Sequence, residues 1–235
     1  MTKAVILVAM QAEAAPIIEA LNLELNDFVS PLPFKRYKGS FRQLEIALFT
    51  SGLDNRHGVD NIGCEPATLM AHIAIEAYQP DLIISAGTAG GFAANGSTIG
   101  EVFLSTEFVF NDRHVPLDGF EESANGHYPS FDTRSLADSL RLRRGVFSTG
   151  SSLEKSAKDL AKAESLNAVS KDMESAAIAW VAMLHNKPLL GIRSITNLVD
   201  LENDSETEFL KNFETAKVAL RKKLLNLLTD ISEKV

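Results

Sequence analysis

The chain has 235 residues, 45% of them hydrophobic and 23% charged, and its net charge is −8. This length suits one α/β domain with a full core, and the acidic balance argues against a nucleic-acid or membrane surface. Cys64 is the only cysteine and the five histidines lack ligand spacing, which excludes an internal disulfide and a cysteine-based zinc site. The apolar opening is too short for a signal peptide or a membrane span. We expect one cytoplasmic domain over residues 1–235, with no metal or cofactor.

Short apolar runs alternate with helical patterns along the chain. Strands are predicted at residues 4–8, 44–50, 82–85, 102–110, 144–148 and 189–195. One helix begins at Pro66 and ends before Pro80, with Leu69, Ile73 and Ala77 as its apolar stripe. Further helices are predicted over residues 174–184 and along the C-terminal segment. This alternation predicts an α/β fold with a mixed, mostly parallel twisted sheet flanked by helices.

Residues 112–132 carry Gly119, Gly126, Pro129 and several acids, and we expect a long loop there. Loops of this length in a compact domain are either functional or solvated excursions from the surface.

Polar and glycine residues follow the predicted strands, where open α/β sheets bind their ligands. Each has a plain structural interpretation: Glu13 and Glu174 as helix-start acids, and Asn197 as the cap of a turn. The glycines of residues 87–91 allow a close backbone approach but lack dinucleotide and P-loop spacing. Arg193 lies within an apolar strand, and because a buried unpaired arginine is costly, we expect a carboxylate partner.

Four segments are specific when taken together: residues 10–14 (MQAEA), 85–92 (SAGTAGGF), 171–177 (KDMESAA) and 195–200 (ITNLVD). Their wording and order resemble the methylthioadenosine/S-adenosylhomocysteine nucleosidases of the nucleoside phosphorylase superfamily. Residues 58–63 (GVDNIG) look most like the plant-type branch, and the resemblance runs from about residue 4 to residue 228. It implies a single-domain, three-layer nucleoside phosphorylase-like fold and hydrolysis of the N-ribosidic bond of 5′-methylthioadenosine, with S-adenosylhomocysteine as a further candidate substrate.

The resemblance also implies roles for individual residues. Glu13 would activate water, helped by Arg193 and Thr88, and Glu174 would accept hydrogen bonds from the ribose, its ionised form being favoured by the helix start. The remaining substrate contacts would come from several segments: Ala89 and Gly90 of the glycine-rich segment, Lys171, Asp172 and Met173 of the ribose-binding motif, Ser152, Leu153 and Glu154 at the purine, and Met10, Leu53 and Phe209 around the 5′-methylthio group. By analogy the protein would be a homodimer, with residues 114–117 reaching a neighbouring site. Because Glu13 would repel phosphate, hydrolysis is expected rather than phosphorolysis.

Asn197 is the one departure from this pattern, since the nucleosidases carry an aspartic acid there that protonates the purine. An amide has no titratable proton to give, so the chain would bind substrate and turn it over slowly. Either the chain is an inactivated variant, or the asparagine is native and reads another base. The alternative functions are therefore a 6-oxopurine nucleoside hydrolase or phosphorylase, and a non-catalytic nucleoside-binding or storage protein.

Overall fold

The computed structural model describes residues 2–26, 31–154, 156–202 and 204–234, and the predicted strands all take part in one sheet. Its strands are β1 (Thr2–Val8), β2 (Glu24–Leu25), β3 (Lys35–Phe41), β4 (Leu44–Thr50), β7 (Leu82–Gly91), β8 (Val102–Phe110), β9 (Tyr128–Pro129), β10 (Arg143–Thr149), β11 (Ala168–Asp172) and β12 (Leu189–Leu198). A separate hairpin pairs β5 (Leu53–Asp54) with β6 (Val59–Asp60). The helices are α1 (Gln11–Ala20), α2 (Cys64–Tyr78), η1 (Ala93–Asn95), α3 (Phe120–Asn125), α4 (Arg134–Leu140), α5 (Ala157–Ser165), α6 (Ser175–Leu184) and α7 (Ser205–Glu233).

The sheet runs in the order β11-β10-β8-β12-β7-β1-β4-β3-β2, and β11 also pairs with β7. Five strands therefore close into a ring, while the remainder continues as an open sheet. Parallel pairing joins β4, β1, β7 and β12 in one run and β8, β10 and β11 in another. Antiparallel pairing joins β12 to β8 and β11 to β7. The expected mixed α/β fold is confirmed.

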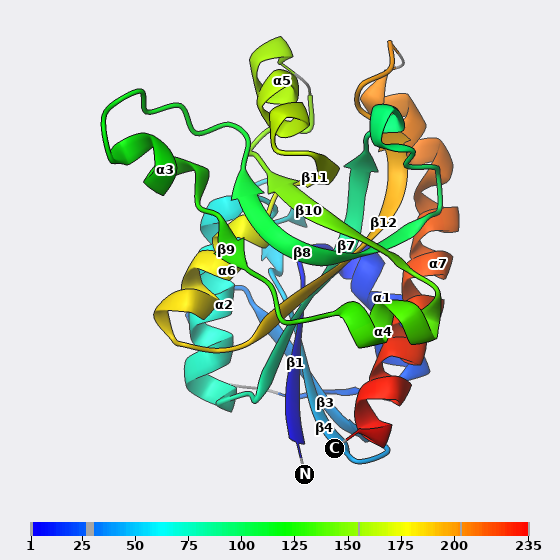
Figure 1. The fold of residues 1–235 in the computed structure, drawn as a ribbon. Helices are drawn as coiled ribbons and strands as arrows, with labels where there is room; N and C mark the ends of the chain where they lie inside the picture. The colour runs from blue at the N-terminus through cyan, green and yellow to red at the C-terminus, as the bar shows by residue number, and fades with distance from the viewer. Residues whose placement is uncertain (1, 27–30, 155, 203, 235) are drawn as a thin grey trace.

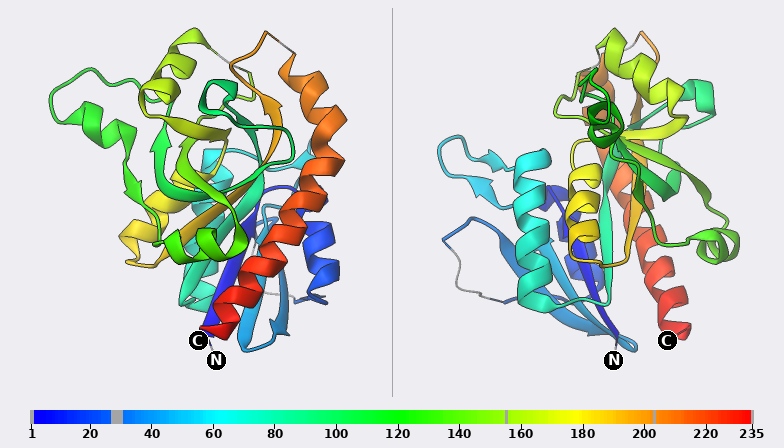
Figure 2. Two further views of the ribbon diagram at one scale, coloured as in Figure 1. Left: turned by 45° about the vertical axis from the view of Figure 1, so that its right-hand side comes forward. Right: turned by 60° about the vertical axis from the view of Figure 1, so that its left-hand side comes forward.

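Helices cover both faces of the sheet (Figure 1), with α2 and α6 on one side and α1, α4 and α7 on the other. Figure 2 shows α7 running along the length of the molecule. The side chains of β1 alternate between the two layers: Val5 and Leu7 join the cluster under α2 and α6, and Ile6 and Val8 join the cluster under α1 and α7. Both faces are consequently buried, which explains the uninterrupted apolar run in this strand.

The buried face of α2 differs from the predicted stripe. Leu69 is 41% exposed, whereas Met70, Ala71 and Ala74 are fully buried. The small alanine side chains let α2 pack against α6, so the buried face of α2 is the one with the smaller apolar side chains.

Two further expectations are corrected. Residues 112–132 contain the short helix α3 and the strand β9, which pairs with β8, and are therefore not one unstructured loop. Strand β7 continues to Gly91, so the glycine-rich segment is sheet rather than loop. Within the described part of the chain, no helix is both long and apolar enough to span a bilayer.

Candidate active site

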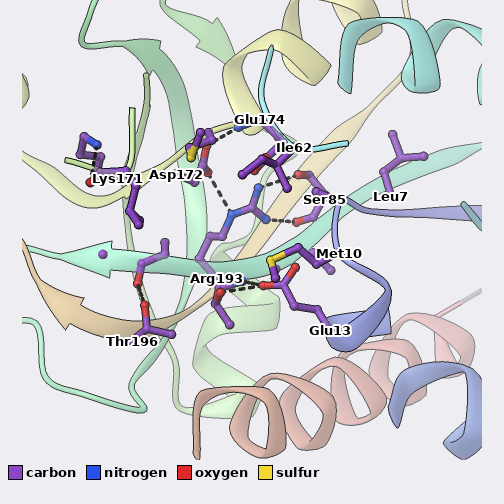
Figure 3. A pocket seen from close by; sticks show the side chains of 18 of the residues that line it. Leu7, Met10, Glu13, Ile62, Ser85, Lys171, Asp172, Glu174, Arg193 and Thr196 are labelled. Carbon is purple, nitrogen blue, oxygen red and sulfur yellow. Dashed lines mark hydrogen bonds and ion pairs between the residues drawn. The ribbon is translucent and has the colours of Figure 1, made fainter. Parts of the chain in front are cut away.

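One cavity opens at the carboxyl ends of β1, β7 and β12, beside the start of α6 (Figure 3). Most of the predicted site residues line it: Met10, Glu13, Thr88, Ala89, Gly90, Leu153, Lys171, Asp172, Met173, Glu174, Arg193, Asn197 and Phe209.

Glu13 lies in the first turn of α1 and is 5% exposed. Its Oε1 accepts hydrogen bonds from the Thr88 amide at 2.7 Å and the Thr88 hydroxyl at 2.6 Å. The Met10 backbone at the helix start also hydrogen-bonds to this carboxyl group. Asp60 provides a second contact to the start of α1, since its carboxylate accepts from the Gln11 amide at 3.2 Å. Burial raises the pKa of Glu13, although the Thr88 bonds and the charge of Arg193 oppose the shift. The carboxyl group is thus held rigidly and binds a proton more readily than an exposed glutamate.

Arg193 has the carboxylate partner that its buried position requires. Its Nε donates to Asp172 at 2.9 Å, and its Nη1 and Nη2 donate to the carbonyl and hydroxyl oxygens of Ser85 at 2.9 and 3.0 Å. Asp172 also accepts from the amides of Glu174 and Ser175, which caps α6. Burial would raise the pKa of Asp172, but Arg193 and the Ser175 bonds outweigh it and hold this pKa below the ordinary value. Asp172 therefore orients the guanidinium rather than facing a ligand alone.

Gly87 separates the Glu13 carboxylate from the Arg193 guanidinium. It is the register partner of Arg193 on β7. A Cβ at this position would lie 3.5 Å from Oε2 of Glu13 and 3.8 Å from Cζ of Arg193, which is ordinary contact distance. At Gly90, by contrast, a Cβ would approach Val199 Cγ1 to 2.4 Å. Gly90 is needed for packing, whereas Gly87 leaves room for one atom in ordinary contact with both charged groups.

Glu174 is the N-cap residue of α6 but makes no capping bond; its Oε1 accepts from the Gly63 amide at 3.0 Å. Burial and the neighbouring charge of Asp172 raise the pKa of Glu174 to about 7. The helix start therefore does not hold this pKa at its ordinary value, because desolvation and a like charge exceed the helix-terminus effect.

Asn197 faces the cavity from an irregular end of β12. The register with β7 shifts between Ile195 and Asn197, so Thr196 bulges and the following side chain is re-aimed. The Thr196 hydroxyl lies 2.9 Å from Asn197 Oδ1 and 3.1 Å from the Ala89 carbonyl oxygen. From α7, the Asn212 amide donates to the Thr196 carbonyl at 2.9 Å. Asn197 is 2% exposed and is therefore fixed by its surroundings.

Leu53, Ser152 and Glu154 are not brought to the cavity wall. Leu53 lies in the β5–β6 hairpin, is 43% exposed and faces a separate surface depression. Ile62, just beyond the hairpin, does line the cavity. Sequence reasoning missed Ile62, although it lies in the plant-type segment of residues 58–63. The side chains of Ser152 and Glu154 are exposed, and their carbonyl oxygens accept from Lys171.

This fold and site place the chain in the phosphorylase superfamily: residues 3–230 match the model of that family, and the chain belongs to it. The 5′-methylthioadenosine nucleosidase of Arabidopsis thaliana is 39% identical over 92% of this chain and 82% of its own. The 5′-methylthioadenosine/S-adenosylhomocysteine nucleosidase of the same plant is 37% identical over 98% of this chain and 92% of its own. Among solved structures, the apo A. thaliana 5′-methylthioadenosine nucleosidase superposes with a TM-score of 0.96 at 36% identity, covering 98% of this chain and 96% of that one. A nucleosidase from Colwellia psychrerythraea in complex with adenine gives 0.79 at 26% identity, covering 97% and 95%.

Proposed function

We propose that this protein is an N-glycosyl hydrolase that converts 5′-methylthioadenosine to adenine and 5-methylthioribose. S-Adenosylhomocysteine is a second proposed substrate, since one of the two A. thaliana relatives is named for both compounds. The nucleosidase names of these relatives do not favour the alternatives of a 6-oxopurine enzyme or a storage protein.

In the proposed reaction, Glu13 is the base that activates water. The water oxygen bonds to C1′ of the ribose as the C1′–N9 bond breaks, and the water proton passes to the carboxylate. The electron pair of the broken bond goes to adenine, which takes a proton from solvent water to leave as a neutral base. A raised pKa suits Glu13 to hold the proton that it receives. The space at Gly87, between Glu13 and Arg193, is where the water would sit.

Glu174 and Met173 would hold the sugar. A carboxylate accepts hydrogen bonds from both ribose hydroxyls, and such charge-assisted bonds are about twice as strong as neutral ones. The methionine sulfur offers a soft, polarisable surface beside the ring as positive charge develops. Because the pKa of Glu174 is about 7 in the free protein, binding of the nucleoside would release a proton below that pH.

Asn197 would face N7 of the adenine. Its amide can donate a hydrogen bond there but cannot protonate the leaving group. We therefore propose that the chain binds nucleoside well and cleaves it slowly. The adenine complex of the C. psychrerythraea relative supports adenine as the base.

The observation that carries this proposal is the Glu13 carboxylate, fixed by Thr88 and facing Arg193 across Gly87. The test is an assay of 5′-methylthioadenosine with and without inorganic phosphate, with the sugar product identified by ³¹P and ¹H NMR. We expect free 5-methylthioribose at a rate that phosphate does not raise. A phosphate-dependent sugar 1-phosphate would show a phosphorylase instead.

We also propose a homodimer in the cytoplasm. Val115 and Leu117, within the segment expected to reach a neighbouring subunit, are 36% and 61% exposed, and the nearby Phe120 is 62% exposed. The lone buried thiol of Cys64 is compatible with a reducing compartment. Light scattering on the purified protein should give twice the chain mass, and a monomer at micromolar concentration would contradict the dimer.

A further inference from the structure

Residues 150–154, here called the base loop, follow β10 and begin at the buried Gly150. Ser151, Ser152, Leu153 and Glu154 are all exposed and lie outside any helix or strand. Leu153 nevertheless lines the cavity with 44% of its surface exposed. An irregular exposed segment loses much conformational entropy when it is ordered, so interactions elsewhere must fix its shape.

Asp112 holds the base loop through one of the backbone amides of the loop. The Asp112 carboxylate accepts a hydrogen bond from the Ser151 amide at 2.7 Å. The preceding residue, Gly150, donates to the Asp172 carbonyl at 3.0 Å. A Cβ at Gly150 would lie 2.3 Å from Oδ1 of Asn111, so a larger residue there would require the Asn111 side chain to move.

Lys171 holds the same loop through the backbone carbonyl groups of the loop. Its ammonium donates to the carbonyl oxygen of Ser152, and it lies 3.3 and 3.5 Å from those of Glu154 and Leu153. The side chain is 7% exposed, and burial lowers its pKa. A buried ammonium is costly unless its three donors are used, and here three successive carbonyl oxygens receive them.

We propose that Asp112 and Lys171 are positioning residues that clamp the base loop in the shape that binds the purine. A carboxylate holds an N–H group and an ammonium holds the C=O groups that follow it, so the backbone is fixed from both sides. The inference rests on the proposed purine nucleoside substrate. A loop ordered before binding avoids the entropy loss at binding, and the clamp should therefore raise affinity for the base alone.

Lys171→Met removes the ammonium and keeps the length of the side chain, and Lys171→Arg keeps the charge and serves as the matched control. Asp112→Ala tests the other arm, with Asp112→Asn as its control because an amide oxygen still accepts from Ser151. Calorimetry would measure adenine and 5-methylthioribose separately. We expect Lys171→Met and Asp112→Ala to weaken adenine binding about tenfold, and the controls to stay within about threefold. Binding of 5-methylthioribose should be unchanged in all four, which a general loss of structure would not give.

Hydrogen exchange of the ligand-free protein separates this inference from the proposed function. Amides of Ser151, Leu153 and Glu154 should exchange faster in Lys171→Met and Asp112→Ala and at the parent rate in the controls. Parent exchange rates and adenine affinity in Lys171→Met would overturn the clamp. If the exchange rates change as expected but the parent protein binds no adenine, the clamp is real and the assigned substrate is wrong. If Lys171→Met does not fold, Asp112→Ala decides the question by the same two measurements.

Discussion

The two ends of the cavity are built differently. At the sugar end, Glu13, Arg193 and Asp172 are nearly fully buried and fixed by bonds between sheet strands and helix starts. At the base end, the wall consists of the exposed base loop and of Asn197 behind a strand bulge. Rigid elements hold a reacting geometry more precisely than loops do. We therefore expect the proposed water activation to depend on the sugar end, and the choice of base to depend on the base end.

The departure from the resembled family fits this division. Arg193 cannot change alone without leaving Asp172 as an unpaired buried charge, which would cost about 3–5 kcal/mol. Asn197 is neutral and borders the cavity, so we expect an exchange between aspartate and asparagine there to disturb the fold less than a change of Arg193.

Glu13→Gln tests the sugar end with the largest expected effect. The amide keeps the bond to Thr88 but cannot take a proton from water, so kcat should fall by about 10²–10⁴-fold. Nucleoside affinity, measured by calorimetry, should stay within a few-fold. Glu19→Gln, on the exposed side of the same helix, is the matched control and should change neither. Unchanged turnover in Glu13→Gln would show that another residue is the general base that activates water.

Asn197→Asp tests the base end and should raise 5′-methylthioadenosine hydrolysis by roughly 10²–10⁴-fold, the usual range for a general acid. An aspartic acid in this buried position would have a raised pKa and would stay protonated until it is needed at N7. Coupled release of adenine, followed spectrophotometrically, measures the gain. The same change in a Glu13→Gln background should gain far less, because water activation would still be lost. If this substrate shows no gain and the parent chain cleaves inosine rapidly, Asn197 is a native residue that recognises a 6-oxopurine base.

Gly87→Ala tests the sugar end by adding a single methyl group between Glu13 and Arg193. The added Cβ fits without a clash but fills the space between Glu13 and Arg193. Displacing the attacking water should lower kcat by about 10²-fold, the usual cost of losing a reacting geometry. Adenine binding should be unchanged, since the base end lies elsewhere. Equal losses in kcat and adenine affinity would mean that the methyl group disturbs the whole cavity.

The sequence predicted most of the sheet because its central strands are buried on both faces and read as continuous apolar runs. It missed β3, which lies near the sheet edge with an exposed or half-buried surface, and α1, a ten-residue helix containing Pro16. The site motifs could be found from their residue patterns. The β5–β6 hairpin, which keeps Leu53 away from the cavity, could not be predicted in this way. The pKa of Glu174 was also out of reach, because it depends on burial and on Asp172 in the folded chain.

Glu174→Gln has the smallest expected effect, and it measures how far the Glu174 carboxylate lowers the free energy of unfolding. Below pH 4.5 the carboxyl is protonated in both the folded and the unfolded chain and has no effect on stability. Between pH 4.5 and about 7 the unfolded chain has lost this proton and the folded chain still holds it, so stability falls as pH rises. Above pH 7 the folded protein carries a half-buried carboxylate beside Asp172, at a cost of about 2 kcal/mol once its partial exposure to the cavity is allowed for. Gln removes this cost and can still accept from the Gly63 amide, so the variant should match the parent near pH 4.5 and exceed it by about 2 kcal/mol at pH 8. Urea unfolding at the two pH values measures the difference, with the exposed Glu164→Gln as the matched control. A gain of equal size at both pH values would assign the effect to packing rather than to ionisation, and the raised pKa of Glu174 would then have to be given up.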